Sequence, residues 1–418
     1  MTEQMNVPTL RFGEFDGEWI NNIFNDISSI TRLAGYEYST YWEEDPNQEI
    51  IALRGYNVGS NKLVLRDLSY ISDKLSKQLN RSRLSKGDIV YPCVGTIGNS
   101  VVIEEDDKYH IQQNIAKITC DNNTSPYFVS QFLSSFWGMR EVYRFNATSS
   151  QPNVLVGSLR NFKISLPQLL EQQKIVSFLS KVDEKISLLT EKKDKLIECK
   201  KGVMQQLFNG KWEEQDGQLN FIPPTLRFKA DEGSDFPDWK KSTLGDIGKV
   251  KMCKRIMANQ TSENGDIPFF KIGTFGREPD AFISQELYDE YRHKFSFPNV
   301  GDILMSASGT LGRTVVYDGS PAYFQDSNIV WIENDGSYTT NEFLFYVYQI
   351  VKYQSEGGTI QRLYNNIIMS AVFDNPSLKE QKKIVKFLSA IDQKIDLANL
   401  ELEKAKEWKK GLLQQMFV

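Results

Sequence analysis

The feature that most constrains this chain is a long internal repeat. The run EQQKIVSFLSKVDEKI begins at Glu171, and EQKKIVKFLSAIDQKI begins at Glu380, 209 positions later. Three other pairs recur in the same order: PTLRF from Pro8 and from Pro224, GDIVYPCVGTIGNSVVI and GDILMSASGTLGRTVVY, and IQQNIAKI and QDSNIVWI. A repeat of this length decides the architecture before any single element does. We therefore expect two copies of a globular domain followed by a helix.

The two copies differ in one block. Residues 36–81 and 255–299 align almost nowhere, although the segments on both sides of them match. A shared scaffold with one divergent block indicates two modules of one design with different targets.

Both recurring helices carry apolar side chains that alternate four and three residues apart, which is the pattern of a coiled-coil seam. The predicted seam residues are Ile175, Leu179, Val182, Ile186, Leu189, Leu196, Val203, Leu207, Ile384, Leu388, Ile391, Ile395, Leu402, Leu412 and Met416. Roughly 38 residues at 1.5 Å each make a rod near 57 Å long. Antiparallel pairing of the two helices would restore a twofold relation between the halves. The alternative is that each helix packs on its own domain.

The remaining sequence predicts α+β domains. Short β-branched runs such as KGDIVYP and NIVWIEN are typical of strands, whereas Tyr127–Phe145 and Asn341–Gln354 have aromatic residues at helical spacing. Those aromatic side chains favour a core over a base-stacking surface. We expect domains at 1–168 and 223–377, coiled-coil helices at 169–208 and 378–418, and a linker at 209–222.

Composition excludes several classes of protein. Hydrophobic residues make up 40% and charged residues 25% of the chain, as in ordinary globular domains. No apolar run reaches the roughly 20 residues that span a bilayer, and the N-terminus does not resemble a secretory signal. The four cysteines form no CxxC pair, which favours a reducing compartment and a cytoplasmic location. Two histidines and no phosphate-binding loop argue against a metal site and a self-contained enzyme.

Positive charge is concentrated locally despite a net charge of −5. Residues 54–86 hold eight Lys or Arg against two Asp, and 249–255 are also basic. Gly-Thr-x-Gly occurs at 95–98 and 309–312, and a polar loop precedes each helix at 146–153 and 357–366. Such side chains can reach bases or phosphates. Solvated surface, a structural hairpin and helix caps are the alternatives.

These parts together resemble the specificity subunit of type I restriction-modification systems. The resemblance is carried by PTLRF followed by Trp19 or Trp239, by GDI…GT[IL]G in both copies, and by the helix starts LLEQQKIVSFL and LKEQKKIVKFL. It implies that each domain reads one half of a split double-stranded DNA site. It also implies that the antiparallel coil sets the gap and docks two modification (methyltransferase) subunits.

The resemblance places the chemistry on partners. The modification subunits would carry S-adenosylmethionine, restriction subunits using ATP and Mg²⁺ can join, and this chain would have no cofactor and no catalysis of its own. A coiled-coil scaffold that presents two unlike binding domains to protein partners is the alternative function, and a fused enzyme is a third.

Candidate DNA-binding residues come from the basic segments, the two turns and the two polar loops. They are Arg54, Lys62, Arg66, Arg81, Arg83, Thr96, Gln151, Lys254, Arg255, Arg292, Lys294, Thr310, Arg313, Gln361 and Arg362. For each of them, solvated surface is the competing interpretation.

Overall fold

The computed structural model describes residues 6–145, 153–215, 218–309, 311–353 and 362–418. The chain divides into two compact units. The first consists of residues 1–192 and 398–418, and the second of residues 193–397. The division cuts both long helices, so each unit contains a part of each helix.

The first unit arranges its strands in the orders β1-β9, β2-β8-β5-β6 and β4-β3-β7. These strands are β1 Ile20–Ile23, β2 Ser28–Thr31, β3 Ile50–Leu53, β4 Ser69–Ile71, β5 Ile89–Pro92, β6 Val101–Val102, β7 Tyr109–Ile111, β8 Ile115–Cys120 and β9 Lys163–Leu166. Its short helices are α1 Phe24–Ile27, α2 Gly35–Tyr41, α3 Asp73–Gln78, α4 Pro126–Leu133, α5 Phe136–Phe145 and α6 Val156–Arg160. Strands and helices are mixed without βαβ alternation, as the sequence predicts.

The aromatic segment from Tyr127 to Phe145 forms two helices, α4 and α5, rather than one. The chain folds back so tightly between them that a Cβ atom on Gly138 would lie 2.3 Å from the carbonyl oxygen of Phe132. Only glycine permits this approach. Gly138 therefore permits the tight turn between α4 and α5, which helical spacing alone does not reveal.

The second unit repeats the sheet orders as β12-β20, β13-β19-β16-β17 and β15-β14-β18. Its strands are β10 Lys211–Gln215, β11 Gln218–Ile222, β12 Lys240–Thr243, β13 Gly248–Lys251, β14 Ile267–Phe270, β15 Phe282–Ile283, β16 Ile303–Ser306, β17 Thr314–Val316, β18 Tyr323–Phe324, β19 Ile329–Asn334 and β20 Val372–Asn375. Its short helices are α8 Leu244–Ile247, α9 Gln285–Lys294, α10 Asn341–Ile350 and α11 Asn365–Ser370. Hydroxyl caps start several of them: Ser284 accepts from Leu287 N at α9, and Thr340 from Phe343 N at α10, each at 3.2 Å.

In both units, two strands of the divergent block join a later strand in the same small sheet. Strand β3 pairs antiparallel with β4 and parallel with β7. Strand β14 pairs antiparallel with β15 and parallel with β18. The difference lies in what surrounds the sheet, since α3 has 6 residues and α9 has 10. Backbone pairing is thus kept where the side chains have lost their resemblance.

The segment expected as a linker, residues 209–222, contains the antiparallel hairpin β10–β11. The indole nitrogen of Trp212 donates to Asp374 Oδ1 at 2.8 Å, and the Trp212 ring lies 5.2 Å from that of Phe221. The hairpin is therefore attached to the second unit through its first strand.

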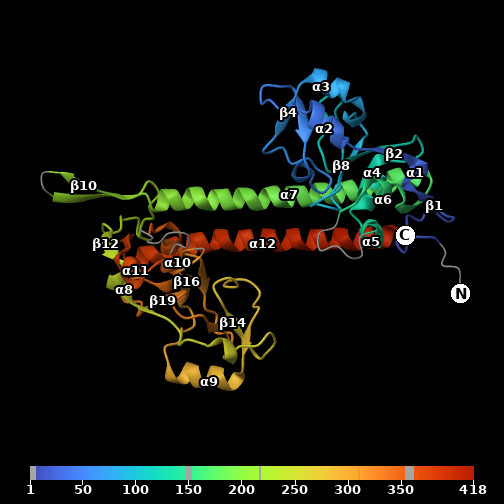
Figure 1. The fold of residues 1–418 in the computed structure, drawn as a ribbon. Coiled ribbons are helices and arrows are strands. Elements are labelled where there is room, and N and C mark those ends of the chain that lie inside the picture. The colour runs from blue at the N-terminus through green and yellow to red at the C-terminus, as the bar shows by residue number, and fades with distance from the viewer. Residues whose placement is uncertain (1–5, 146–152, 216–217, 310, 354–361) are drawn as a thin grey trace. The chain divides into compact units, whose positions relative to one another are not determined.

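The two long helices are α7 Leu169–Leu207 and α12 Leu378–Met416. They lie side by side and antiparallel within each unit (Figure 1). In the first unit, Asp183 pairs with Lys409 at 2.6 Å and Lys192 with Glu401 at 3.1 Å. In the second unit, Lys200 pairs with Asp392 at 2.7 Å.

All predicted seam residues are buried or half-buried on these helices. Buried in the first unit are Ile175, Leu179, Val182, Leu402, Leu412 and Met416, and in the second unit Leu207, Ile384 and Leu388. Half-buried are Ile186, Leu189, Leu196, Val203, Ile391 and Ile395. The ends of the seam also join the domain cores, because α12 delivers Met416 and Phe417 to the first core, and α7 delivers Met204 and Leu207 to the second. Packing on a domain and helix pairing therefore occur together.

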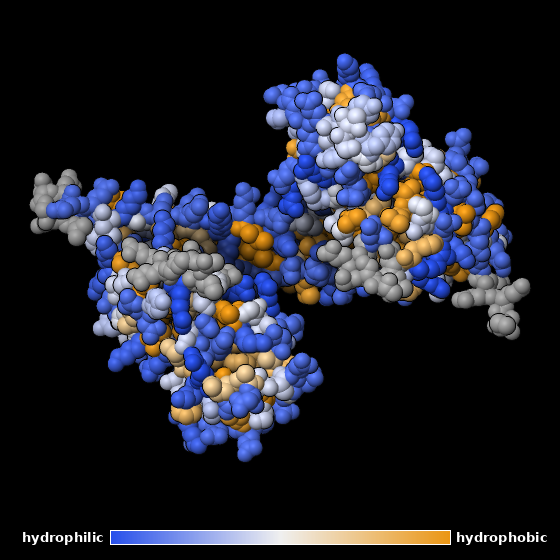
Figure 2. Space-filling model, viewed as in Figure 1, coloured by the Kyte–Doolittle hydropathy of each residue, from blue (hydrophilic) through white to orange (hydrophobic). Residues whose placement is uncertain are grey.

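In the view of Figure 2 the surface is mostly hydrophilic, and apolar residues gather in small groups. Among the described residues, no helix combines the length and the apolar character that crossing a membrane requires.

Candidate nucleic-acid interface

In the first unit, three separate segments meet at the Gly-Thr-x-Gly turn between β5 and β6. Gly95 and Gly98 have φ values of 81° and 92°, a left-handed conformation that favours glycine. Thr96 Oγ1 donates to the carbonyl oxygen of Gly55 at 3.0 Å, which ties the turn to the divergent block just after β3. Val94 pairs with Asn153, which joins the turn to the segment before α6. The shared turn, the divergent block and Asn153 thus meet in the first unit.

The second unit repeats the positive φ values and the pairing with the following segment at the turn between β16 and β17. Gly309 and Gly312 have φ values of 67° and 73°. Ser308 pairs with Arg362 in the segment before α11, and Leu363 N donates to Ala307 O at 2.8 Å. The structure therefore brings the predicted residue Arg362 to the turn.

Arg54 lies at this surface in the first unit, where Glu44 holds it. Arg54 Nη2 donates to Glu44 Oε2 at 2.8 Å, and Glu44 Oε1 accepts from Trp42 at 2.9 Å and Gln112 at 2.6 Å. Burial acts to raise the pKa of Glu44, but hydrogen bonds from Trp42, Ser69 and Arg54 outweigh it and lower that pKa. The carboxylate is thus ionised at neutral pH and fixes the direction of the Arg54 guanidinium.

Three predicted arginines of the second unit contact the two segments that follow β14 and β18. Arg255 pairs with Asp326 at 2.8 Å. Arg362 Nη2 donates to Ser327 O at 3.3 Å, and Arg313 Nη1 donates to Phe275 O at 2.9 Å. Arg255 is well exposed, whereas Arg313 and Arg362 are half-buried. A neutral carbonyl does not cancel a guanidinium charge, and in the described part of the chain no carboxylate pairs with Arg313 or Arg362.

The other basic candidates of the first unit divide by exposure. Lys62, Arg66 and Arg81 are exposed, and within the described part of the chain no ion pair is seen for them. Arg83 is different, because its side chain is 12% exposed and pairs with Asp73 at 2.8 Å and Asp107 at 2.9 Å. Because two carboxylates pair with its guanidinium, Arg83 connects parts of the chain to each other.

The remaining candidates of the second unit surround the end of α9. Lys254 lies over the ring of Phe295, 5.3 Å from its centroid. Arg292 lies over Tyr288 and Phe297 at 5.7 and 5.4 Å. Lys294 pairs with Glu290 at 2.9 Å, one turn back on the helix. The contacts of these residues are with side chains on α9 or just after it, whereas the arginines at the turn contact the segments after β14 and β18. Gln151, Thr310 and Gln361 lie outside the described residues.

Sequence reasoning passed over Tyr56 and Tyr364, which are exposed beside predicted arginines. Their side chains are 45% and 49% exposed. Tyr56 OH accepts from Arg54 Nη1 at 3.1 Å, and the Arg362 guanidinium lies 5.7 Å from the centre of the Tyr364 ring. An aromatic residue two positions after an arginine in both copies was the available signal.

Asn61 was also missed, although it lies in the basic segment. Asn61 Nδ2 donates to Asp183 Oδ2 on α7 at 3.2 Å, and Ser130 Oγ donates to Asn61 Oδ1 at 3.1 Å. Its φ of 54° is a conformation that asparagine tolerates. Asn61 therefore fixes the divergent block of the first unit on the long helix.

No metal-binding arrangement is present in the described ranges, where no three His, Cys, Asp or Glu side chains gather closely enough. His110 is fully buried, and its ring nitrogens lie 2.9 Å from Ile111 O and 3.2 Å from Leu79 O. His293 is exposed on α9.

Comparison with known proteins identifies the family. The chain matches the type I restriction modification DNA specificity domain twice, over residues 44–198 and 237–407. It therefore belongs to the family of type I restriction-modification specificity subunits, as the sequence motifs predict.

Individual relatives agree along nearly the whole chain. A putative type I restriction enzyme specificity subunit of Haemophilus influenzae is 38% identical over 377 residues, covering 84% of this chain and 94% of the relative. The putative MjaX specificity subunit of Methanocaldococcus jannaschii is 24% identical and covers 98% of this chain and 95% of its own. The crystal structure of an S subunit from M. genitalium covers 99% of both chains with a TM-score of 0.54 and 15% identity. That likeness concerns the fold.

Proposed function

We propose that this chain is the sequence-specific DNA-binding subunit of a type I restriction-modification complex, and that each domain reads one half of a bipartite site. The observation that carries the proposal is the repeated surface at the Gly-Thr-x-Gly turn. In the first unit Thr96 of the turn contacts Gly55 of the divergent block, and Val94 pairs with Asn153. In the second unit Arg313, just after the turn, donates to Phe275 O in the divergent block, and Ser308 pairs with Arg362. A constant support for variable side chains suits two readers of different sequence.

The exposed side chains of this surface are suited to DNA. Arginine can bind guanine bidentately, and lysine and arginine neutralise phosphates. The net charge of −5 is compatible with this role, because local charge governs the encounter and partner subunits can share phosphate contacts.

The helix pair is proposed to set the gap between half-sites and to dock two modification subunits. Each long helix has 39 residues without interruption and contributes to both units. Half-sites one helical turn apart on DNA are separated by about 34–36 Å. Tethering makes the second half-site contact intramolecular, so two weak readers become one tight reader.

The chemistry is proposed to belong to the partners. Modification subunits would bind S-adenosylmethionine and methylate adenine, and restriction subunits using ATP and Mg²⁺ can join. This chain alone is expected to show no turnover. On the same grounds we propose that the protein acts on DNA in the cytoplasm.

Co-expression with the neighbouring methyltransferase gene, followed by genome-wide mapping of methylated adenines, tests the proposal. Expected is a split motif with two short halves and a fixed gap. A stable complex that adds no methylation would instead favour the scaffold for protein partners. Salt titration of DNA binding by the complex separates these functions again, because only phosphate contacts weaken steeply with salt.

A further inference from the structure

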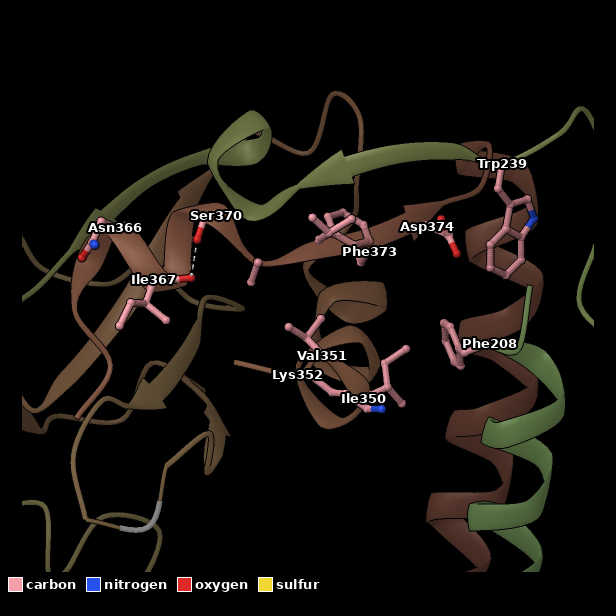
Figure 3. A pocket seen from close by; sticks show the side chains of 12 residues that line it. Phe208, Trp239, Ile350, Val351, Lys352, Asn366, Ile367, Ser370, Phe373 and Asp374 are labelled. Atoms are coloured by element: carbon pink, nitrogen blue, oxygen red, sulfur yellow. Dashed lines mark hydrogen bonds between the residues drawn. The ribbon is translucent and has the colours of Figure 1, made fainter. Parts of the chain in front are cut away.

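The second unit contains an open cleft of about 800 Å³ beside the end of α10. Phe208 at the end of α7, Trp239 before β12, Phe373 on β20 and Ile350 on α10 border it (Figure 3). Its edge is made by Ser370, Ala371 and Val372, where α11 passes into β20. Polar side chains, among them Lys352, Asn366 and Asp374, line it together with the apolar ones. Its volume is in the range of ligand-binding clefts.

In the first unit, helix α5 occupies the corresponding place. The repeat offset of 209 relates Asn161, Phe162 and Lys163 to the three edge residues of the cleft. Helix α5 contacts all three: Arg144 donates to Asn161 O at 2.6 Å, Phe145 stacks on Phe162 at 5.8 Å, and Lys163 N donates to Glu141 Oε2 at 2.8 Å.

The second unit has no counterpart of α5 in its described residues, because residues 351–353 and 362–364, between α10 and α11, form no helix. The cleft is also widened, since Ala371 stands where the first unit has Phe162. Among the described residues, no helix of the second unit fills the groove that α5 fills in the first.

The strand register shows which polar group the cleft offers. Leu244 N, at the start of α8, donates to the carbonyl oxygen of Ala371, just before β20, at 3.0 Å, next to the pair Thr243 and Val372 of β12 and β20. In a trans peptide the N–H of Val372 points opposite to the carbonyl of Ala371. The N–H of Val372 therefore points away from β12, and Val372 lines the cleft.

The first unit shows what such an N–H binds. Phe24 N donates to Phe162 O at 3.0 Å, which leaves the N–H of Lys163 pointing away from β1 in the same way. The carboxylate of Glu141 accepts it, and Val142, the next residue of α5, is fully buried.

We propose that the cleft is a docking groove for an amphipathic helix of a partner protein. The helix carries a carboxylate that accepts from Val372 N. It places an aliphatic residue at the next position and an aromatic residue four positions after the carboxylate, as Glu141, Val142 and Phe145 do in α5. The aromatic residue is the neighbour of both others on the helix surface, at i,i+4 from the carboxylate and at i,i+3 from the aliphatic residue, a spacing used in helix-in-groove recognition. This inference holds whether or not the chain reads DNA.

A helix-stabilised fluorescent peptide with the sequence of residues 134–145 tests the proposal on the purified full-length chain. Saturable binding on the order of micromolar is expected by anisotropy. A Glu141→Gln peptide is expected to bind about fivefold more weakly, because one charge-assisted hydrogen bond is weakened.

Two chain variants form a matched pair on α11. Asn366 lines the cleft and Asn365 does not, and both are exposed. Asn366→Trp should weaken peptide binding at least tenfold, whereas Asn365→Trp should leave it unchanged, with equal thermal unfolding in both. Hydrogen exchange at Val372 should be fast in the free chain and slow with peptide bound.

Three results would overturn the proposal. They are the absence of saturable binding, binding that Asn366→Trp does not change, and a Val372 amide already protected in the free chain. The last result would mean that the chain itself covers the groove.

Discussion

The guanidinium of Arg11 holds the carboxylate of Glu171 in two hydrogen bonds, 2.7 Å from Nε and 2.8 Å from Nη2. Arg227 repeats this contact with Glu380 at 3.0 and 3.3 Å. The side chains of Glu171 and Glu380 are 2% and 0% exposed. The recurring PTLRF and EQ motifs are therefore the two halves of one buried ion pair in each copy.

The adjacent glutamine completes the joint between each helix and its domain. Gln172 Oε1 accepts from Ser125 N at 2.8 Å, and its Nε2 donates to Pro167 O at 2.9 Å. Gln381 repeats both roles, with Thr340 N at 2.9 Å and Pro376 O at 2.9 Å. The motif that identifies the family thus serves the fold.

Removing one partner of the buried pair should destabilise the chain strongly. Glu171→Ala leaves the half-buried Arg11 without its counter-charge, and we expect a loss of about 3 kcal/mol in the free energy of unfolding. Urea unfolding of the full chain measures it. Glu14→Ala is the matched control, since Glu14 pairs with Lys174 at the exposed surface and should have little effect. Equal losses in both variants would refute this role of the pair.

Basic residues of the first unit should separate into DNA contacts and internal ties. If the chain binds DNA as proposed, Lys62→Ala and Arg66→Ala should each reduce the slope of log K against log salt by about 0.9 when they remove one phosphate contact. Arg83→Ala should instead lower thermal stability, because Asp73 and Asp107 lose their partner. Binding titrations at several salt concentrations, with melting curves beside them, check both expectations. An unchanged slope in Lys62→Ala and Arg66→Ala would remove these residues from the interface.

Lengthening both long helices should change the accepted gap between half-sites. Seven residues added to α7 between Lys193 and Lys200, and seven to α12 between Asp392 and Glu401, keep the seam in phase. The pair would grow by about 10 Å, which corresponds to about three base pairs. Methylation mapping with the co-expressed partner reads the new gap. Insertion in α7 alone is the control, because it displaces the Lys200–Asp392 pair and should reduce stability. A gap that stays unchanged would mean that the helices do not set it.

The buried ring of His110 should make the stability of the chain depend on pH. Burial lowers its pKa below the ordinary 6.5, and the charges of Arg83 and Lys117 act in the same direction, against the carbonyl groups of Ile111 and Leu79. The unfolded chain then takes up a proton near pH 6.5 that the native ring takes up only at lower pH. The free energy of unfolding should therefore fall as the pH is lowered through 6.5. His110→Gln should show a smaller fall between pH 7.5 and 5.5 in urea unfolding, and an identical fall would contradict the prediction.

Thiol reactivity should distinguish the four cysteines. Burial raises the pKa of Cys93 to about 11 and those of Cys120 and Cys253 to about 12, whereas Cys199 is exposed on α7. The thiolate is the reactive form, so at pH 8 one thiol per native chain should react rapidly with an aromatic disulfide reagent. Cys199→Ser should abolish that phase, and unfolding should release the other three thiols. A rapid phase that survives in Cys199→Ser would place another thiol at the surface.

Local patterns in the sequence determined the duplication, the α+β class and the two long helices. Heptad spacing and β-branched runs reflect the conformational preferences of neighbouring residues. Because these patterns occur twice in the chain, they can be recognised from the sequence alone. The seam positions could be read for the same reason, because a helix with polar flanks has only one stripe to bury.

Only the tertiary structure decided which distant side chains meet. The ring centres of Phe417 and Phe128 lie 4.9 Å apart in the first core, although nearly 300 positions separate these residues. Arg83 and Arg66 look alike in a basic segment, yet only Arg83 has two carboxylates against it. Charge and periodicity are local properties, whereas ion pairs and core contacts depend on long-range packing that spacing does not encode. The open cleft is the clearest case, because it depends on a helix that one copy has and the described part of the other lacks.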